Sequence, residues 1–89
     1  GVAARTARVE NSNLDQAEAL LYPNPVNSYL NITVPKGMES VNVFTTNGVR
    51  VNDVRIYNDG IDVSQLKAGV YMVIIKTEKG IIRDKFIKD

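Results

Sequence analysis

The 89-residue sequence has no cysteine, no histidine and no tryptophan. Without cysteine the chain can form neither a disulfide framework nor a thiolate metal site, so its core must be held together by packing alone. Without histidine it lacks the usual acid–base group at neutral pH and the commonest ligand of transition metals. These absences argue against catalysis, and we expect no enzyme, no metal site and no cofactor.

Long apolar runs and a large net charge are also absent. No run approaches the ~18 apolar residues that a membrane-spanning helix needs, so we expect no membrane span. Eleven basic and ten acidic side chains leave a formal charge of +1. That balance argues against a binder of nucleic acid or anionic membrane that acts through bulk charge.

The basic residues are nevertheless concentrated near the C-terminal end. Lysine on an exposed edge strand prevents unwanted strand pairing, and a basic stripe can also steer a charged partner. The sequence alone leaves both interpretations open. Five of the eleven cations lie in the last fourteen residues, at Lys76, Lys79, Arg83, Lys85 and Lys88.

The acidic residues form no catalytic or metal-binding pattern. Residues 58–62 offer two carboxylates and an amide, but an EF-hand loop needs oxygen ligands up to a closing glutamate, so a turn followed by a strand is expected here. The ten carboxylates contain no pair placed for the acid–base work of a glycosidase.

The chain length fits one small domain. Residues 1–13 are small and polar without a sustained period, so we expect an exposed linker or tail there and a folded domain at residues 14–89. Residues 15–21 precede Pro23, which would stop a helix, and are expected to be extended or irregular.

From residue 29 onward apolar and polar residues alternate, which is the period of a half-buried strand. Asn47-Gly48 predicts a two-residue hairpin with a type I′ turn, in which both residues have positive φ. The buried face is expected to carry Leu30, Ile32, Val34, Val41 and Val43.

Three further patterns concern the second half of the chain. The apolar parity changes across Asn52-Asp53, which predicts a β-bulge. Residues 64–69 fit a single helical or 3₁₀ turn, with Ser64 as its cap and Gly69 at a left-handed exit. Residues 70–75 are apolar on both faces, as expected for a central strand, and Ile74→Ala should cost ~2–5 kcal/mol of stability.

Short turns separate these segments, at Pro35-Lys36-Gly37, Asn58-Asp59-Gly60 and Glu78-Lys79-Gly80. About seven short strands at spacings of about ten residues are typical of a two-sheet sandwich. The sequence therefore predicts an all-β fold, an immunoglobulin-like two-sheet β-sandwich of antiparallel strands.

Four phrases of sequence occur in one order along this chain. They are Leu21-Tyr22-Pro23-Asn24-Pro25, Thr46-Asn47-Gly48-Val49-Arg50-Val51, Ile61-Asp62-Val63-Ser64-Gln65-Leu66-Lys67-Ala68-Gly69-Val70-Tyr71 and Arg83-Asp84-Lys85-Phe86-Ile87-Lys88-Asp89. Each has a structural explanation by itself, as a proline turn, a hairpin or a strand end. Together they resemble the C-terminal sorting domain of the type IX secretion system of Bacteroidetes, over about residues 14–89.

The resemblance gives a family position to particular residues. The phrase that opens the folded module corresponds to Tyr22, Pro23, Asn24 and Pro25, the hairpin to Asn47 and Gly48, and the end of the third phrase to Gly69 and Tyr71. The terminal pattern of the family corresponds to Lys85, Phe86, Ile87 and Lys88. Two departures are Val49, which stands before Arg50 where the family commonly has an immediate cation, and Asp89 at the extreme end.

The function implied by this resemblance is that of a non-catalytic signal domain. The type IX translocon would bind it on the periplasmic side and export an N-terminal passenger across the outer membrane, to the cell surface or the medium. Outer-membrane shuttle and signal-peptidase components of the system would be further partners. In many members the domain is then cut off and the passenger is joined to an anionic lipopolysaccharide, whereas others keep the domain as part of the machinery.

The terminal pattern also implies which residues the translocon recognises, namely Lys85, Phe86, Ile87 and Lys88. A strand at a sheet edge can pair its backbone with a receptor while its side chains alternate into pockets, and the lysines would steer the encounter. Deleting residues 85–89 is then expected to stop export while most of the sandwich stays folded. Any processing cut is expected within residues 1–13.

Two other interpretations remain open at this point. A carbohydrate-binding or adhesive β-sandwich of a secreted protein would use exposed aromatic rings in a line, and an inert spacer would tolerate loss of its last strand. The only aromatic residues are Tyr22, Tyr29, Phe44, Tyr57, Tyr71 and Phe86.

Overall fold

The computed structural model describes residues 5–8, 18–34 and 37–89. Every regular element in these residues is a strand, and no helix long and apolar enough to cross a membrane occurs in them. The strands are β1 (Arg5–Arg8), β2 (Glu18–Tyr22), β3 (Tyr29–Thr33), β4 (Ser40–Thr45), β5 (Arg55–Tyr57), β6 (Gly60–Asp62), β7 (Gly69–Thr77) and β8 (Gly80–Lys88).

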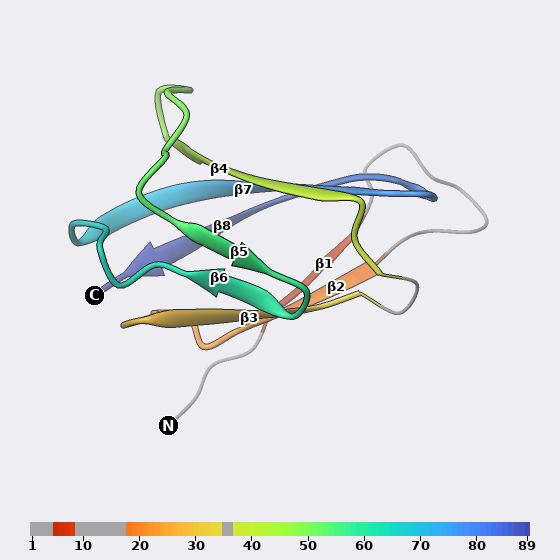
Figure 1. Cartoon of the computed structure of the whole chain (residues 1–89), viewed down its shortest axis with the longest axis horizontal. Coiled ribbons are helices and arrows are strands. Elements are labelled where there is room, and N and C mark those ends of the chain that lie inside the picture. Colours follow the sequence, from red (N-terminus) through yellow and green to blue (C-terminus); the bar gives the residue numbers. More distant parts are fainter. Residues whose placement is uncertain (1–4, 9–17, 35–36) are drawn as a thin grey trace.

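The strands form two sheets that face each other (Figure 1). One sheet has the order β1-β2-β3-β6-β5, the other has the order β4-β7-β8, and every pair is antiparallel. Without β1, this is the strand order of a constant-type immunoglobulin domain. β2, β3, β6 and β5 correspond to the four strands of one sheet of that domain, and β4, β7 and β8 to the three strands of the other. The predicted all-β sandwich is confirmed, and its seven strands are β2 to β8.

Strand β1 was not predicted from the sequence. It lies within the segment expected to be a linker and pairs with β2, from Arg5 opposite Leu21 to Arg8 opposite Glu18. Residues 5–8 have no apolar alternation, so this backbone pairing leaves no periodic signal in the sequence. The other residues of the predicted linker lie outside the described part of the chain.

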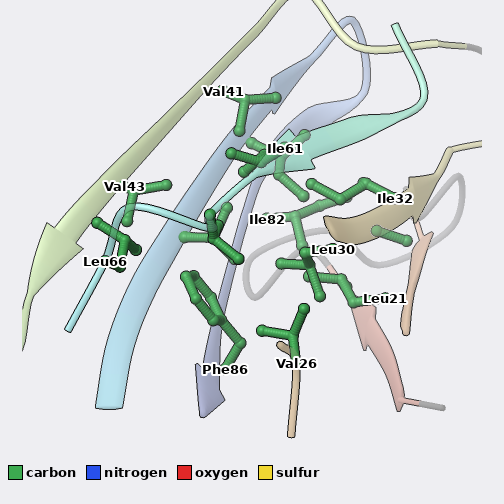
Figure 2. Packing of buried hydrophobic residues seen from close by; sticks show 14 residues of the cluster. Leu21, Val26, Leu30, Ile32, Val41, Val43, Ile61, Leu66, Ile82 and Phe86 are labelled. Atoms are coloured by element: carbon green, nitrogen blue, oxygen red, sulfur yellow. The ribbon is translucent and has the colours of Figure 1, made fainter. Parts of the chain in front are cut away.

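Hydrophobic side chains from both sheets meet between them in one core (Figure 2). Because the chain has no disulfide, burial of these side chains is the main force that joins the layers. The predicted alternation on β3 and β4 is confirmed, with Val34 packed at the margin. The buried residues are Ala19, Leu21, Val26, Leu30, Ile32, Val41, Val43, Ile61, Val63, Leu66, Val73, Ile75, Ile82 and Phe86.

The turn after β4 is not of type I′, because Asn47 does not have a positive φ. Gly48 alone does, with φ 89°. The carbonyl oxygen of Thr45 accepts a hydrogen bond from Gly48 N at 3.0 Å, and Thr45 N donates to the carbonyl oxygen of Val49 at 2.8 Å. The loop therefore has three residues, with glycine in its left-handed position. The Thr45 side chain makes this possible, because its Oγ1 accepts from Val49 N at 3.0 Å.

The predicted β-bulge at Asn52-Asp53 is also wrong. The chain leaves the sheet of β4 after a bridge between Phe44 and Arg50 and enters the opposite sheet at β5. Val51 and Val54, on either side of the crossing, both pack against the core. The change of apolar parity thus marks the passage between the two sheets. Because the sheets lie on opposite sides of the core, the inward direction reverses along this segment.

Residues 64–69 form a turn without a helix. Its cap is Asp62, where the sequence had suggested Ser64. Asp62 Oδ1 accepts hydrogen bonds from Ser64 N at 2.9 Å and from Ser64 Oγ at 2.6 Å. Donation by the Ser64 hydroxyl and then by its backbone N–H lowers the pKa of Asp62 below its ordinary value. Leu66 N closes the turn on the carbonyl oxygen of Val63 at 3.0 Å.

Tyr71 connects this turn to the start of β7. Its hydroxyl donates to the carbonyl oxygen of Lys67 at 2.7 Å, four residues upstream. β7 corresponds to the sixth strand of an immunoglobulin-like sandwich. A tyrosine near the start of that strand that bonds back in this way is called the tyrosine corner. The ring also stacks on Phe86, with centroids 5.6 Å apart and planes at 21°. Tyr71 therefore fixes both the corner and the last strand.

The central position of the apolar strand is confirmed, because β7 lies between β4 and β8. Val73 and Ile75 point into the core and are fully buried, whereas Ile74 lies on the opposite face and is only half buried. The loss of stability predicted from the sequence for Ile74→Ala assumed that Ile74 lies in the core. The residue buried there is its neighbour Ile75.

Ile75→Ala is expected to lower the free energy of unfolding by about 2–5 kcal/mol, because it leaves a cavity between the sheets. Ile74→Ala is the matched control and should cost clearly less, since part of that side chain is already in water. Urea unfolding of both variants measures the difference. Equal losses would contradict the assignment of the two faces of β7.

Candidate functional site

The turn between β2 and β3 lies against the C-terminal end of β8. Val26 N donates to the carbonyl oxygen of Ile87 at 2.7 Å, and Asp89 N donates to that of Val26 at 2.9 Å. Asn24 contributes through its side chain, whose Oδ1 accepts from Ile87 N at 2.8 Å. Residues 24–26, which we call the clamp, therefore act as a short extra strand beside the end of β8.

The sequence around the clamp explains why it can take this place. Pro23 and Pro25 carry no N–H group, so neither backbone nitrogen needs an acceptor. Between them, the short amide of Asn24 supplies the acceptor that a backbone carbonyl would supply in a regular ladder. The Val26 side chain is fully buried, and Asn31 Nδ2 on β3 donates to the carbonyl oxygen of Tyr22 at 3.2 Å. The clamp is thus fixed by the buried Val26 side chain, and the two strands that flank it are joined by the Asn31–Tyr22 bond.

The four residues of the terminal pattern point alternately into and out of the sandwich. Phe86 is 1% exposed, and Figure 2 shows its ring pointing into the core. Lys88 is 7% exposed, and its Nζ donates to the carbonyl oxygen of Asp89 at 2.8 Å. Lys85 and Ile87 are exposed on the other side of the sheet. Of these four, only Lys85 and Ile87 offer well-exposed side chains to a partner.

The outer edge of β8 near its end has its donors in use. Lys85 N donates to Asp84 Oδ1 at 2.8 Å, and the next two donors on that edge, Ile87 N and Asp89 N, bond to the clamp. A receptor strand that added here would first have to displace these bonds. The expectation that the terminal strand is recognised through free backbone groups therefore does not fit residues 85–89.

Deletion of residues 85–89 would also remove part of the core. Phe86 is among the largest fully buried side chains, and loss of a buried phenylalanine typically costs ~3–5 kcal/mol. Burial of Phe86 therefore argues against the expectation that this deletion leaves the sandwich folded.

The exposed aromatic residues do not form a line. Tyr29 and Tyr57 have ring centroids 6.1 Å apart, but their planes are tilted by 45°. Tyr29 donates its hydroxyl to Asp59 Oδ1, and this bond raises the pKa of Tyr29 to about 12. Beneath the ring lies Gly60, where a Cβ would come within 2.8 Å of Tyr29 Cε2 and 2.3 Å of the Leu30 carbonyl oxygen. This geometry holds Tyr29 in the fold and provides no flat platform for a sugar.

The carboxylates of the predicted turn at residues 58–62 face protein donors. Asp59 accepts from Tyr29 and Asp62 accepts from Ser64. In the described part of the chain, no group of three or more acidic, histidine or cysteine side chains is arranged to hold a metal ion.

Comparison with known families decides the assignment. The sequence model of the secretion system C-terminal sorting domain matches residues 20–89, which include all four phrases. The chain belongs to this family. Its members are non-catalytic signal domains, and a sorting domain marks a secreted or surface protein. No significant match to a curated protein was found, and none to a solved structure.

In this sorting domain three of the four phrases meet in space. Asn24 of the first phrase bonds to Ile87 of the fourth, and Tyr71 of the third stacks on Phe86 of the fourth. Asn47-Gly48 of the second phrase makes its hydrogen bonds within its own hairpin. Sequence reasoning found these residues but missed their contacts, because partners such as Asn24 and Ile87 are 63 residues apart.

Asn24→Ala is expected to increase the hydrogen-exchange rate of the Ile87 amide and to cost about 0.5–1.5 kcal/mol, since the side-chain acceptor is lost. Asn24→Asp keeps an oxygen at that position and should preserve protection of the amide. Asn27→Ala, at an exposed position of the same turn, controls for substitution of an asparagine. Unchanged exchange of Ile87 in Asn24→Ala would show that the clamp does not hold the strand.

Proposed function

We propose that this sorting domain is the export signal by which a type IX translocon recognises an N-terminal passenger. The translocon binds the folded sandwich on the periplasmic side of the outer membrane, and the passenger leaves for the cell surface or the medium. The observation that carries this proposal is the family match across β2 to β8. The clamp supports binding of the folded domain, because its hydrogen bonds hold the end of the last strand in place in the folded sandwich.

Within the terminal pattern, Lys85 and Ile87 are the residues that contact the translocon. Both side chains point away from the core, so they can be bound without unfolding. Lys85 provides charge that speeds the encounter, and Ile87 provides apolar area. Phe86 and Lys88 act indirectly, by fixing the strand from the inner side.

Export of a fusion protein tests the proposal. A neutral periplasmic reporter followed by residues 1–89 should reach the cell surface or medium in a host with the translocon. The reporter alone should stay in the periplasm, as should the fusion in a host that lacks the translocon. A folded fusion that remains periplasmic in the competent host would contradict an export function. A variant shortened at residue 84 is no substitute, since it also removes the buried Phe86 side chain from the core.

After export, the signal peptidase of the system removes the domain and joins the passenger to an anionic lipopolysaccharide. The cut lies within residues 1–13, before the matched region, whereas the backbone from β2 onward is part of the sandwich. Because residues 5–8 pair with β2, a cut inside β1 requires that strand to open first.

Mass spectrometry of exported reporter should therefore give a new C-terminus within residues 1–13, with a mass increase from the attached lipopolysaccharide. The same fusion in a host without the signal peptidase is the control and should keep the whole domain. A reporter that ends beyond Tyr22 would contradict the assigned segment. An intact fusion at the surface of the competent host would show that this domain is retained, as in the machinery components of the family.

A further inference from the structure

Each sheet of the sandwich has one side that points away from the core. We call that side of the β4-β7-β8 sheet the outer face. Alternation along each strand and the strand register place eleven side chains on it. They are Ser40, Asn42 and Phe44 of β4, Val70, Met72, Ile74 and Lys76 of β7, and Ile81, Arg83, Lys85 and Ile87 of β8.

Apolar side chains gather at one end of the outer face, where β7 begins and β8 ends. Val70 and Ile87 are opposite each other in the register and are 45% and 44% exposed. Met72, the next outward residue on β7, is half buried between Phe44 on one side and Lys85 on the other. Adjacent exposed apolar side chains of this kind are typical of an interaction surface, since scattered single ones need no partner.

The charge on the outer face has one sign. Lys76 and Lys85 are both exposed, and Arg83 lies between them on the same side of the sheet. None of the eleven positions is acidic, although the chain as a whole has ten acidic and eleven basic residues. The near-neutral sequence therefore folds into a domain with a basic outer face, and its complement is an acidic surface.

The other outward surface has a different character. On the β3-β6-β5 side, Asp62 is paired in register with Tyr29 and Arg55, so acidic and basic groups are next to each other. Tyr29 and Asp62 on this side bond within the domain, to Asp59 and Ser64. Charge of a single sign beside an apolar cluster thus distinguishes the outer face from the β3-β6-β5 side.

We propose that the outer face of the β4-β7-β8 sheet is the docking surface of the domain, and that it binds an acidic protein surface with an apolar patch on the translocon. The proposal rests on the proposed export function and adds to it the location and chemistry of the contact. Lys85 and Ile87 belong to this face, which extends across β7 to β4. The blocked donors at the end of β8 agree with docking through side chains.

Two other occupants fit the face less well. A second copy of the chain would present the same basic side chains, Lys76 and Lys85 among them, and like charges across an interface are unfavourable. An anionic membrane would match the charge, but membrane-surface segments typically carry tryptophan or tyrosine at the interface. The outer face has neither of these residues.

Two matched pairs of substitutions test the inference in the export assay. Lys85→Glu should slow export about tenfold, because an acidic partner would then meet a like charge. Lys67→Glu makes the same charge change at an exposed position outside the face and should leave export unchanged.

The second pair removes apolar area. Ile81→Ser, at a side chain 44% exposed on the face, should also slow export. Ile56→Ser, at a side chain 47% exposed on the other sheet, should not. Lys85→Gln removes the charge without reversing it and should give an intermediate rate.

Thermal melting of the same five variants separates docking from folding. If the parent fusion is not exported, the proposed function fails. If the parent is exported, and Lys85→Glu and Ile81→Ser melt like the parent and are exported at the parent rate, the outer face is not the docking surface. Slow export of Lys67→Glu and Ile56→Ser to the same extent would likewise overturn it.

A photo-crosslinking residue at position 87 identifies the occupant. It should form an adduct with a protein only in cells that have the translocon, at a site rich in acidic residues, and the same probe at position 56 should not. An adduct with a second copy of the domain would overturn the assignment. Binding of the purified domain to phosphatidylglycerol vesicles that is lost in Lys85→Glu, without a protein adduct, would point to a membrane and would overturn it too.

Discussion

The C-terminal strand of this domain is held from three directions, and the rest of the structure depends on that arrangement. β7 pairs with β8 along its length, the clamp bonds to its other edge at Ile87 and Asp89, and Phe86 is inserted into the core. A domain of this size without disulfides has little free energy to spare. Fixing the final strand with one buried ring and a few directed hydrogen bonds is therefore a substantial part of what stabilises the sandwich.

This arrangement divides the residues that identify the family into two kinds. Asn24, Tyr71 and Phe86 have no free surface role, because each is engaged in holding β8 or the corner before β7. Lys85 and Ile87 lie between such residues in the sequence but on the opposite side of the sheet. A family signature in a short terminal strand thus combines structural and exposed positions, and the period of two separates them. The part of the strand left for a partner is its outer side chains, since its edge is already bonded.

Much of the fold could be predicted from the sequence, because local rules decide it. Alternation at Leu30 and Ile32 shows a buried face whatever the partner strand is, and glycine-rich turns separate the strands. Predictions failed where the deciding interaction came from elsewhere. The Thr45 side chain lengthened the Asn47-Gly48 turn, and the passage from one sheet to the other produced the parity change that had indicated a bulge. β1 lacks any apolar pattern and exists through backbone pairing with β2.

The sequence by itself determined the all-β class, the order of the strands along the chain and the family, since these follow from periodicity, turn residues and ordered phrases. It also excluded cysteine and histidine chemistry outright. Only the tertiary structure decided which terminal residues are available to a partner. Phe86 and Lys88 are buried while Lys85 and Ile87 are exposed, and the edge beside them is closed by a turn 63 residues earlier in the chain. Such contacts depend on how the two sheets pack. A local sequence pattern cannot predict them, because the two partners are far apart in the chain.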